Sequence, residues 1–427
     1  MTSTHSRPSS SLRALEWLNF FIADVQTGLG PFLAAYLSAN GWNPARVGYA
    51  LTFQGLITVG FQTPAGAIVD AARRKRLLVI AGLGFLVAGA LLLCLRSNAS
   101  TVYTSGFLIG VAGPLLGPTL AAITLGLVSG DKFDTQFARN QSFNSAGNVA
   151  TALLIGLIGY GLGYRAVFLT TAFFAIPSII SLLRIDTAKI DHARARGSTA
   201  DHKEVSPEGV WQLTRDRVLL FFLASVFLFH LSNAAMLPQL GELLAHGKAR
   251  AAAPFMSACT IVTQLVIALA AAWVGKRAHQ GGRRPLLLLG FGVLPIRGLL
   301  YTLTKIPALL VAIQVLDGVA NCIFVVVSIL VIADLTKGTG RFNLASGAMA
   351  TVQGIGAALS NALGGFLIQK LGFNASFAGL ALIGALAFSL LVWKVPETKN
   401  HVGRLAEGQN APVFGLKGSP IEEQQSD

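Results

Sequence analysis

Long apolar segments alternate with short polar ones along most of the chain. A helix needs about 20 apolar residues to cross the hydrocarbon core of a membrane, and twelve segments reach roughly that length. They cover residues 15–39, 47–69, 77–95, 101–129, 140–162, 165–183, 218–243, 252–275, 285–303, 307–335, 343–369 and 373–394. These segments are too long for spanning β-strands and lack their alternating pattern. The pattern therefore predicts an all-α membrane protein with twelve transmembrane helices.

One long polar segment divides the twelve helices into two sets of six. This segment, residues 184–217, mixes acidic and basic residues and has no apolar period. We therefore expect a short N-terminal segment (1–14), a first six-helix bundle (15–183), a linker (184–217), a second six-helix bundle (218–394) and a polar tail (395–427).

The two sets of six helices repeat one another at a constant offset of 209 residues. The offset aligns residues from two separate regions: Gly66 with Gly275, Arg74 with Arg283, Gly147 with Gly356, Gly156 with Gly365, Gly163 with Gly372 and Phe168 with Phe377. Because each set holds six helices, both enter the membrane in the same orientation, which is the parallel repeat of one transporter class. We expect two similar bundles with a shared cleft that opens to either side in turn.

Composition and charge support this interpretation. Charged residues make up 12% of the chain, against about 25% in soluble domains. The net charge of +14 would indicate nucleic-acid binding in a soluble protein. Here 25 basic residues lie in one set of loops and tails, 7 lie in the opposite loops, and one, Arg297, lies within a helix. By the positive-inside rule, we expect both termini in the cytoplasm. We also expect a location in the plasma membrane (the inner membrane of a bacterium) and no nucleic-acid partner.

Motifs for enzyme chemistry are absent from the sequence. The three cysteines, Cys94, Cys259 and Cys322, lie inside apolar segments without a metal-ligand or disulfide spacing. There is no nucleotide-binding loop, so ATP-driven transport is not expected. We expect no enzymatic activity, no cofactor and no metal. The expected partners are a small-molecule substrate, protons and the lipid bilayer, and we expect a monomer.

The segment between the second and third predicted helices carries a glycine, an aspartate four residues later and then a basic cluster. These residues, Gly66, Asp70, Arg74 and Lys75, resemble the cytoplasmic signature loop of the major facilitator superfamily. The twelve helices, the repeat and the long central segment are similar to that family as well. The resemblance implies a transporter in which these four residues latch the cytoplasmic side closed. The alternative is that the basic residues only fix the topology.

A glycine–proline cluster gives a second, partial resemblance. Gly110, Gly113-Pro114 and Gly117-Pro118 are similar to the Gly-Pro motif of the drug/proton antiporter branch of this superfamily. That motif belongs to the fifth helix, however, whereas this cluster lies in the fourth. The alternative interpretation is a kinked, closely packed helix.

Few ionisable residues lie deep within the predicted helices, and each is costly enough there to indicate a function. They are Asp24, His230, Arg297 and Asp317, and at the 209 offset none aligns with another charged residue. Asp24 is expected near the midplane in the first helix, and we assign proton coupling to it, because a carboxyl group can exchange a proton for substrate. The alternative is a buried carboxyl group that fixes helix packing.

The family resemblance implies that the first, fourth, seventh and tenth helices line the cleft. The polar residues of these helices become candidates for the substrate cavity, together with Arg297 of the ninth helix: Gln26, Thr119, His230, Asn233, Gln314, Asp317 and Asn321. Arg297 and Asp317 lie on adjacent helices, so either a structural ion pair or a role of Arg297 in binding an anionic substrate is open.

The sequence favours a secondary active transporter that works by alternating access. Proton-coupled export of a small organic compound, as in an efflux antiporter, is our first hypothesis. The alternative is a proton-linked uptake permease for a metabolite or a siderophore-like anion, which Arg297 and His230 would suit. A third hypothesis is a membrane receptor or scaffold that transports nothing.

Overall fold

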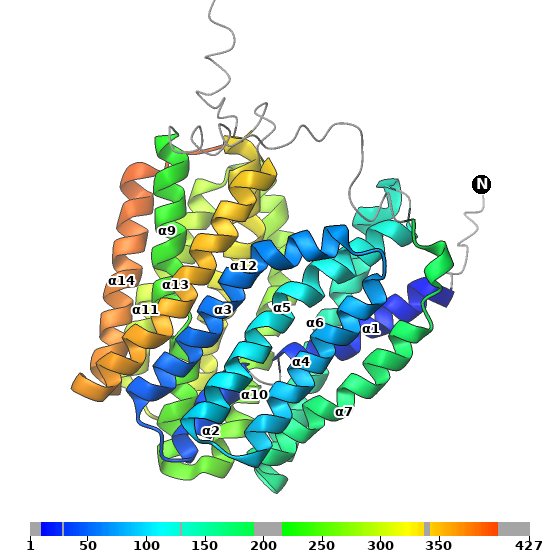
Figure 1. The fold of residues 1–427 in the computed structure, drawn as a ribbon. Coiled ribbons are helices and arrows are strands. Elements are labelled where there is room, and N and C mark those ends of the chain that lie inside the picture. The colour runs from blue at the N-terminus through cyan, green and yellow to red at the C-terminus, as the bar shows by residue number, and fades with distance from the viewer. Residues whose placement is uncertain (1–9, 28–29, 129, 192–215, 337–341, 400–427) are drawn as a thin grey trace, which may run out of the picture.

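The computed structural model describes residues 10–27, 30–128, 130–191, 216–336 and 342–399 (Figure 1). Within these residues the secondary structure consists of thirteen α-helices and one 3-10 turn, with no strand. The predicted all-α architecture is confirmed. The element labels follow Figure 1, in which no helix carries the label α8.

The first half of the described chain holds seven helices. They are α1 (Ser10–Thr27), α2 (Gly30–Ala39), α3 (Pro44–Ala71), α4 (Lys75–Leu95), α5 (Ala99–Leu127), α6 (Gly130–Leu162) and α7 (Tyr164–Leu183), and the 3-10 turn η1 (Thr187–Lys189) follows them.

The second half holds six helices. They are α9 (Arg217–Asn233), α10 (Met236–Gly281), α11 (Arg284–Leu303), α12 (Pro307–Leu335), α13 (Phe342–Leu371) and α14 (Phe373–Lys394). In Figure 1 this half stands on the left and the first half leans away to the right, with α3 packed along α13 between them.

The starts of several helices follow from local side-chain chemistry. Asn43 accepts a hydrogen bond from the Arg46 amide (2.9 Å) at the start of α3, where Pro44 takes the first helical position. Asp216 accepts bonds from the amides of Val218 and Leu219 at the start of α9. Such side-chain acceptors satisfy amides that have no partner within the helix. These caps fix where the apolar segments become helical.

Almost all the described residues of the twelve predicted segments lie on helices, and those of the first segment lie in α1 and α2. The structure differs from the prediction at the seventh segment, which consists of α9 and the beginning of α10, and at the fifth. The helix α10 has 46 residues and continues through the loop that we predicted between the seventh and eighth segments. The helix α6 begins at Gly130, ten residues before the predicted start, so residues assigned to a loop are helical.

Ten helical segments of the described residues are long and apolar enough to cross a membrane. The other two predicted spans are α1 with α2, described as separate helices, and α3, which carries Gln54 and Gln62. Large apolar side chains face outward along the bundle: Leu157 is 74% exposed, Leu269 82% and Trp393 79%. An outer surface of this kind is suited to lipid rather than water.

The repeat predicted from the sequence is visible in two equivalent turns. Gly163 and Gly372, 209 residues apart, have nearly the same left-handed φ (81° and 84°) at the turns before α7 and α14. Glycine adopts this φ without steric cost.

A pair of side-chain contacts repeats as well. Arg76 Nη2 donates to the carbonyl of Leu183 (3.2 Å), and Arg284 Nη2 donates to the carbonyl of Val392 (2.8 Å). In each half an arginine at the start of the third helix of the repeat, α4 or α11, is therefore bonded to the end of the sixth, α7 or α14. The two halves have the same internal construction.

Candidate functional site

The two halves meet closely at one end of the bundle. The helix α3 packs on α13, and α10 packs on α2 and α6. A Cβ atom placed on Gly365 of α13 would lie 3.0 Å from the Cα of Gly48, and one placed on Gly156 of α6 would lie 2.8 Å from Ser257 Oγ. These two contacts are equivalent in the repeat, because Gly156 aligns with Gly365 and Gly48 with Ser257. Glycine permits this close approach of backbones.

A hydrogen bond joins the same two halves between α3 and α13. Thr52 Oγ1 donates to the carbonyl of Ala358 (2.7 Å), and both residues are buried. At the same end, Gly241 of α10 lies against Ala35 of α2. The halves are therefore sealed where α3 begins and α13 ends.

At the opposite end the halves separate. Added Cβ atoms at Gly60 and Gly66 of α3 and at Gly347 of α13 would meet nothing within 4 Å. A cavity of about 600 Å³ lies between α6 and α10, lined by residues that include Gln141, Ser145 and Gln264. The helix α3 ends directly before the basic residues 73–76. We call this the basic end, and the cleft between the halves opens toward it.

A polar pocket of about 400 Å³ lies on the first-half side, between α1, α5 and α6. Its lining includes Asn19, Thr124, Asn140, Gln141 and Asn144, with apolar residues around them. Asn140 Nδ2 donates to Thr124 Oγ1 (3.0 Å), and Asn144 Nδ2 donates to the carbonyl of Asn19 (3.2 Å). The pocket therefore offers neutral amide and hydroxyl groups to a ligand.

An ion pair lies next to this pocket. Glu16 of α1, whose side chain is 3% exposed, is 2.7 Å from Arg139 Nε of α6, whose side chain is 50% exposed. Gln136 Nε2 bridges Glu16 Oε1 (3.2 Å) and Asn140 Oδ1 (3.0 Å). A chain of hydrogen bonds therefore links the buried carboxylate to Thr124 and the pocket.

A second polar cluster lies inside the second half. Arg297 of α11, 1% exposed, forms an ion pair with Asp317 Oδ1 of α12. Asn321 Nδ2 donates to the same oxygen (2.9 Å), and Thr263 Oγ1 donates to Asp317 Oδ2 (3.1 Å). The sequence left open whether Arg297 forms a structural ion pair with Asp317 or binds an anionic substrate, and the structure shows the two side chains as an ion pair. Asp317 holds three donors from three helices, which compensates for burial of its charge.

Several polar atoms around this pair have no hydrogen-bond partner among the described residues. They include Arg297 Nε, Tyr301 Oη and Asn233 Oδ1. Asn233 does contribute its backbone carbonyl, which accepts from Arg297 Nη2 at 3.5 Å. Gln314, 1% exposed, has no conventional partner for either amide atom and lies beside the Cys259 thiol. The structure thus groups five of the predicted cavity residues: Asn233, Arg297, Gln314, Asp317 and Asn321.

Two other predicted cavity residues make local contacts. Thr119 of α5 is fully buried, and its hydroxyl donates to the carbonyl of Leu115 in its own helix (2.6 Å). His230 is 8% exposed; its Nδ1 is 3.1 Å from the carbonyl of Val226, and its ring packs edge-on against Phe324. Neither lines the polar pocket or joins the Arg297 cluster.

The predicted latch is described only in part. Arg74 is exposed before α4, while Lys75 is 2% exposed and its Nζ donates to the carbonyl of Val69 (2.8 Å). Lys75 therefore ties the start of α4 to the end of α3. The side chains of Asp24, Gln26 and Asp70 lie outside the described residues.

The sequence analysis missed three buried or paired charges. Arg139 was assigned to a loop, whereas it lies within α6 and pairs with Glu16, which is two turns inside α1. Glu242 stood at the end of a predicted helix, but α10 continues past it and leaves its carboxyl group 2% exposed, with Oε2 lacking a partner. The pairing of Glu16 with Arg139 could have been predicted from their opposite charges at matching depth in neighbouring helices.

Comparison with known sequences identifies similar proteins. The family model described as Major Facilitator Superfamily matches residues 17–293 and 247–421. An uncharacterized MFS-type transporter of Mycobacterium tuberculosis is 40% identical over 415 residues, which is 96% of this chain and 98% of that protein. Multidrug resistance protein MdtG of Klebsiella pneumoniae is 31% identical over 175 residues, covering 38% of this chain and 42% of MdtG.

Solved structures of similar fold include two transporters. The nucleoside transporter NupG aligns with a TM-score of 0.73 and 14% identity, covering 90% of this chain and 99% of that one. The peptide transporter POT aligns with a TM-score of 0.71 and 14% identity, covering 92% and 94% of the two chains. At this identity the likeness concerns the fold alone.

Proposed function

The chain belongs to the major facilitator superfamily, and on that premise we propose that this transporter exports a small organic compound by proton-coupled alternating access. We further propose that the arrangement described above is its cytoplasm-facing state. In this assignment the basic end lies in the cytoplasm together with both termini, as the positive-inside rule favours.

The observation that carries the proposal is the closure of the cleft at one end only. Gly156 lies against Ser257, and Gly365 lies against Gly48, whereas toward the basic end a cavity of about 600 Å³ lies between α6 and α10. Two rigid halves that touch at one end and separate at the other form one of the two states that alternating access requires. Rocking about the contact would close the basic end and open the other.

Asp24 remains our candidate for proton coupling, on the evidence of its position in the sequence. It lies within α1, in the first predicted segment. An intramembrane carboxyl group that alternately faces a proton and a substrate couples their movements. We propose in addition that Gly66, Asp70, Arg74 and Lys75 latch the basic end in the opposite state.

The polar pocket beside α1 supports a substrate that carries hydrogen-bonding groups. Its described lining contains amides and a hydroxyl but no charged side chain. Uptake of an anion, the alternative hypothesis, would need Arg297 as an available cation. The ion pair of Arg297 with Asp317 neutralises that charge, which favours an uncharged or cationic substrate.

The test uses everted membrane vesicles that contain the full chain, with the fluorescent dye ethidium and a panel of small organic compounds as probes. Export predicts accumulation inside the vesicles that a protonophore abolishes. The variant Asp24→Asn should lose this accumulation while it remains inserted and folded. Thr170→Val is the control, since the Thr170 hydroxyl bonds to the carbonyl of Ala166 within α7 and belongs to no proposed site, and it should keep the activity.

Three results would contradict the proposal. Accumulation by the Asp24→Asn variant at the normal rate would remove Asp24 from proton coupling. Substrate uptake by whole cells that is lost when the gene for this protein is deleted would support the uptake permease instead. A folded, inserted protein that moves neither protons nor any compound would support a receptor or scaffold.

The latch is tested by the Asp70→Ala variant, which should transport more slowly while its substrate binding is unchanged. A normal rate of transport by this variant would exclude the latch role of Asp70.

A further inference from the structure

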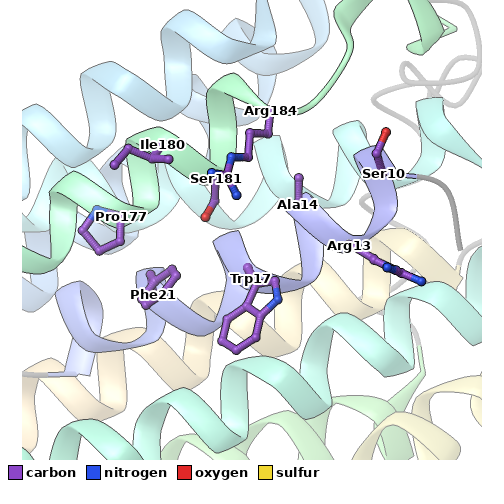
Figure 2. A pocket seen from close by; sticks show the side chains of 9 residues that line it. All are labelled: Ser10, Arg13, Ala14, Trp17, Phe21, Pro177, Ile180, Ser181 and Arg184. Carbon is purple, nitrogen blue, oxygen red and sulfur yellow. The ribbon is translucent and has the colours of Figure 1, made fainter.

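A groove of about 930 Å³ lies between α1 and α7 at the basic end, outside the cleft. Its lining consists of Ser10, Arg13, Ala14, Trp17, Phe21, Pro177, Ile180, Ser181 and Arg184 (Figure 2). The helix α7 packs against α1, α4 and α6, all of the first half. The groove is therefore a feature of the first bundle alone and is separate from the polar pocket.

The groove is apolar at one end and basic at the other. Figure 2 shows Phe21, Pro177 and Ile180 together at one end, Trp17 and the Arg184 guanidinium group in the middle, and Ser10 and Arg13 toward the other end, with the Arg13 side chain directed away from that of Arg184. Arg13 lies in the first turn of α1 and Arg184 directly follows α7, at the basic end, which we assign to the surface of the membrane. The apolar part therefore lies at the depth of acyl chains and the basic part at the depth of lipid headgroups.

The basic part of the groove carries uncompensated charge. Arg13 and Arg184 are both exposed, neither forms an ion pair among the described residues, and no acidic side chain lines the groove. Figure 2 shows the Arg184 side chain turned toward α1. Arginine is well suited to phosphate, because its planar guanidinium group can donate two parallel hydrogen bonds.

The apolar part has side chains that remain open to a ligand. Trp17 is 49% exposed and Ile180 is 47% exposed. Tryptophan is enriched at the boundary between headgroups and acyl chains, where its ring is apolar and its N–H group stays polar. A volume of about 930 Å³ exceeds what a phosphate ion needs and is sufficient for a headgroup with part of a chain.

We propose that this groove is a binding site for one anionic phospholipid from the leaflet at the basic end. Arg184 binds the phosphate, Arg13 adds a second positive charge at the outer end of the groove, and the acyl chain lies along Phe21, Pro177 and Ile180. The quaternary ammonium group of a zwitterionic phosphatidylcholine would add a further positive charge beside the two arginines, and a free phosphate ion would leave the apolar part empty. The inference does not depend on the direction or the substrate of transport.

The experiment is native mass spectrometry of the full chain in detergent, titrated with phosphatidylglycerol or with phosphatidylcholine of the same acyl chains. The protein should retain one phosphatidylglycerol in preference to phosphatidylcholine. Each basic side chain near an anionic surface contributes about 1 kcal/mol. At about 1.4 kcal/mol per factor of ten, the double variant Arg13→Gln, Arg184→Gln should bind phosphatidylglycerol about 30-fold more weakly and lose the preference.

Two further variants separate a built site from general attraction to basic residues. Arg277→Gln is the matched control, because Arg277 also lies at the basic end beside an exposed tryptophan, Trp273 (5.7 Å), but lines no described groove. It should bind phosphatidylglycerol like the natural protein. Ile180→Trp fills the apolar part and leaves both charges in place, and it should weaken binding of phosphatidylglycerol. In a separate competition experiment, millimolar inorganic phosphate should fail to displace the lipid from the natural protein.

Several results would overturn the proposal. Equal weakening by Arg277→Gln would indicate general electrostatic attraction. Unchanged binding by the double arginine variant would exclude these arginines as the headgroup site. Full displacement by inorganic phosphate would indicate an anion site without an acyl chain. Tighter lipid binding after deletion of residues 2–9 would indicate that the N-terminal segment is the natural occupant.

Discussion

Enlarging Gly156 should open the end of the cleft that the structure holds closed. A Cβ atom at Gly156 would lie 2.8 Å from Ser257 Oγ, 3.0 Å from Ser257 Cβ and 3.3 Å from Pro254 Cα. A leucine adds three more carbon atoms in the same direction. Overpacking of this kind costs about 1–3 kcal/mol, which corresponds to a change of about 5–150-fold in the ratio of two states.

The cost applies only to the state in which α6 and α10 touch at this end. The Gly156→Leu variant should therefore favour the opposite state rather than unfold. The matched control is Gly161→Leu in the same helix, because a Cβ atom at Gly161 would meet nothing within 4 Å. The control should leave the ratio of the two states unchanged, and it accounts for any effect on the helix itself.

The assay is a distance measurement by electron paramagnetic resonance in liposomes. Spin labels replace Arg165 in the first half and Lys305 in the second, both exposed near the closed end, after the three native cysteines are changed to serine. The Gly156→Leu variant should shift the distance distribution toward longer separations and slow transport. A distribution identical to that of the control, in a folded protein, would refute the reasoning that these contacts seal the cleft.

Three further predictions concern charged groups. Asp317→Asn leaves Arg297 buried without its counter-charge, so it should lower the free energy of unfolding by about 3–5 kcal/mol, measured by thermal unfolding in detergent. Adding Arg297→Gln to this variant should restore most of the lost stability. Additive losses in the double variant would show that the two residues are not coupled. Glu16→Leu removes a buried acceptor of two donors and should cost about 1–3 kcal/mol in the same assay, whereas no loss would mean that the bonds are not maintained. Burial alone would raise the pKa of Glu397, but backbone amides, first that of Arg283, outweigh burial and hold the pKa below its ordinary value of 4.5. The stabilisation by Glu397 is therefore present above about pH 4.5 and is lost as the pH falls through the lower native pKa, so the difference in unfolding temperature between the natural protein and Glu397→Gln should shrink toward pH 3.

The number and order of the membrane helices could be predicted because each is an apolar segment bounded by polar residues. The repeat could be predicted for a related reason: Gly163 and Gly372 occupy turns that need a positive φ, so the same residue appears in both copies. Asn43 and Asp216 likewise mark helix starts by a rule that operates within a few residues. These features depend on local chemistry, which the sequence displays directly.

The start of α6 could not be predicted because its polar residues find partners in other helices. Gln136 and Asn140 are typical of a loop by composition, yet Glu16 of α1 and Thr124 of α5 supply their hydrogen bonds. The pairing of Arg297 with Asp317 stayed open for the same reason, since it depends on the rotation of two helices. The site therefore required tertiary contacts, whereas the fold did not.

No ion pair among the described residues crosses the seal between the halves. The ion pairs Glu16–Arg139, Asp186–Lys189, Arg283–Asp334 and Arg297–Asp317 each lie within one half. Across the seal the structure has glycine contacts and the bond from Thr52 to Ala358. Ionic strength, which screens exposed charges, should therefore have little direct effect on this contact, and any dependence of the two conformations on salt concentration should arise at the basic end, where the charged residues lie.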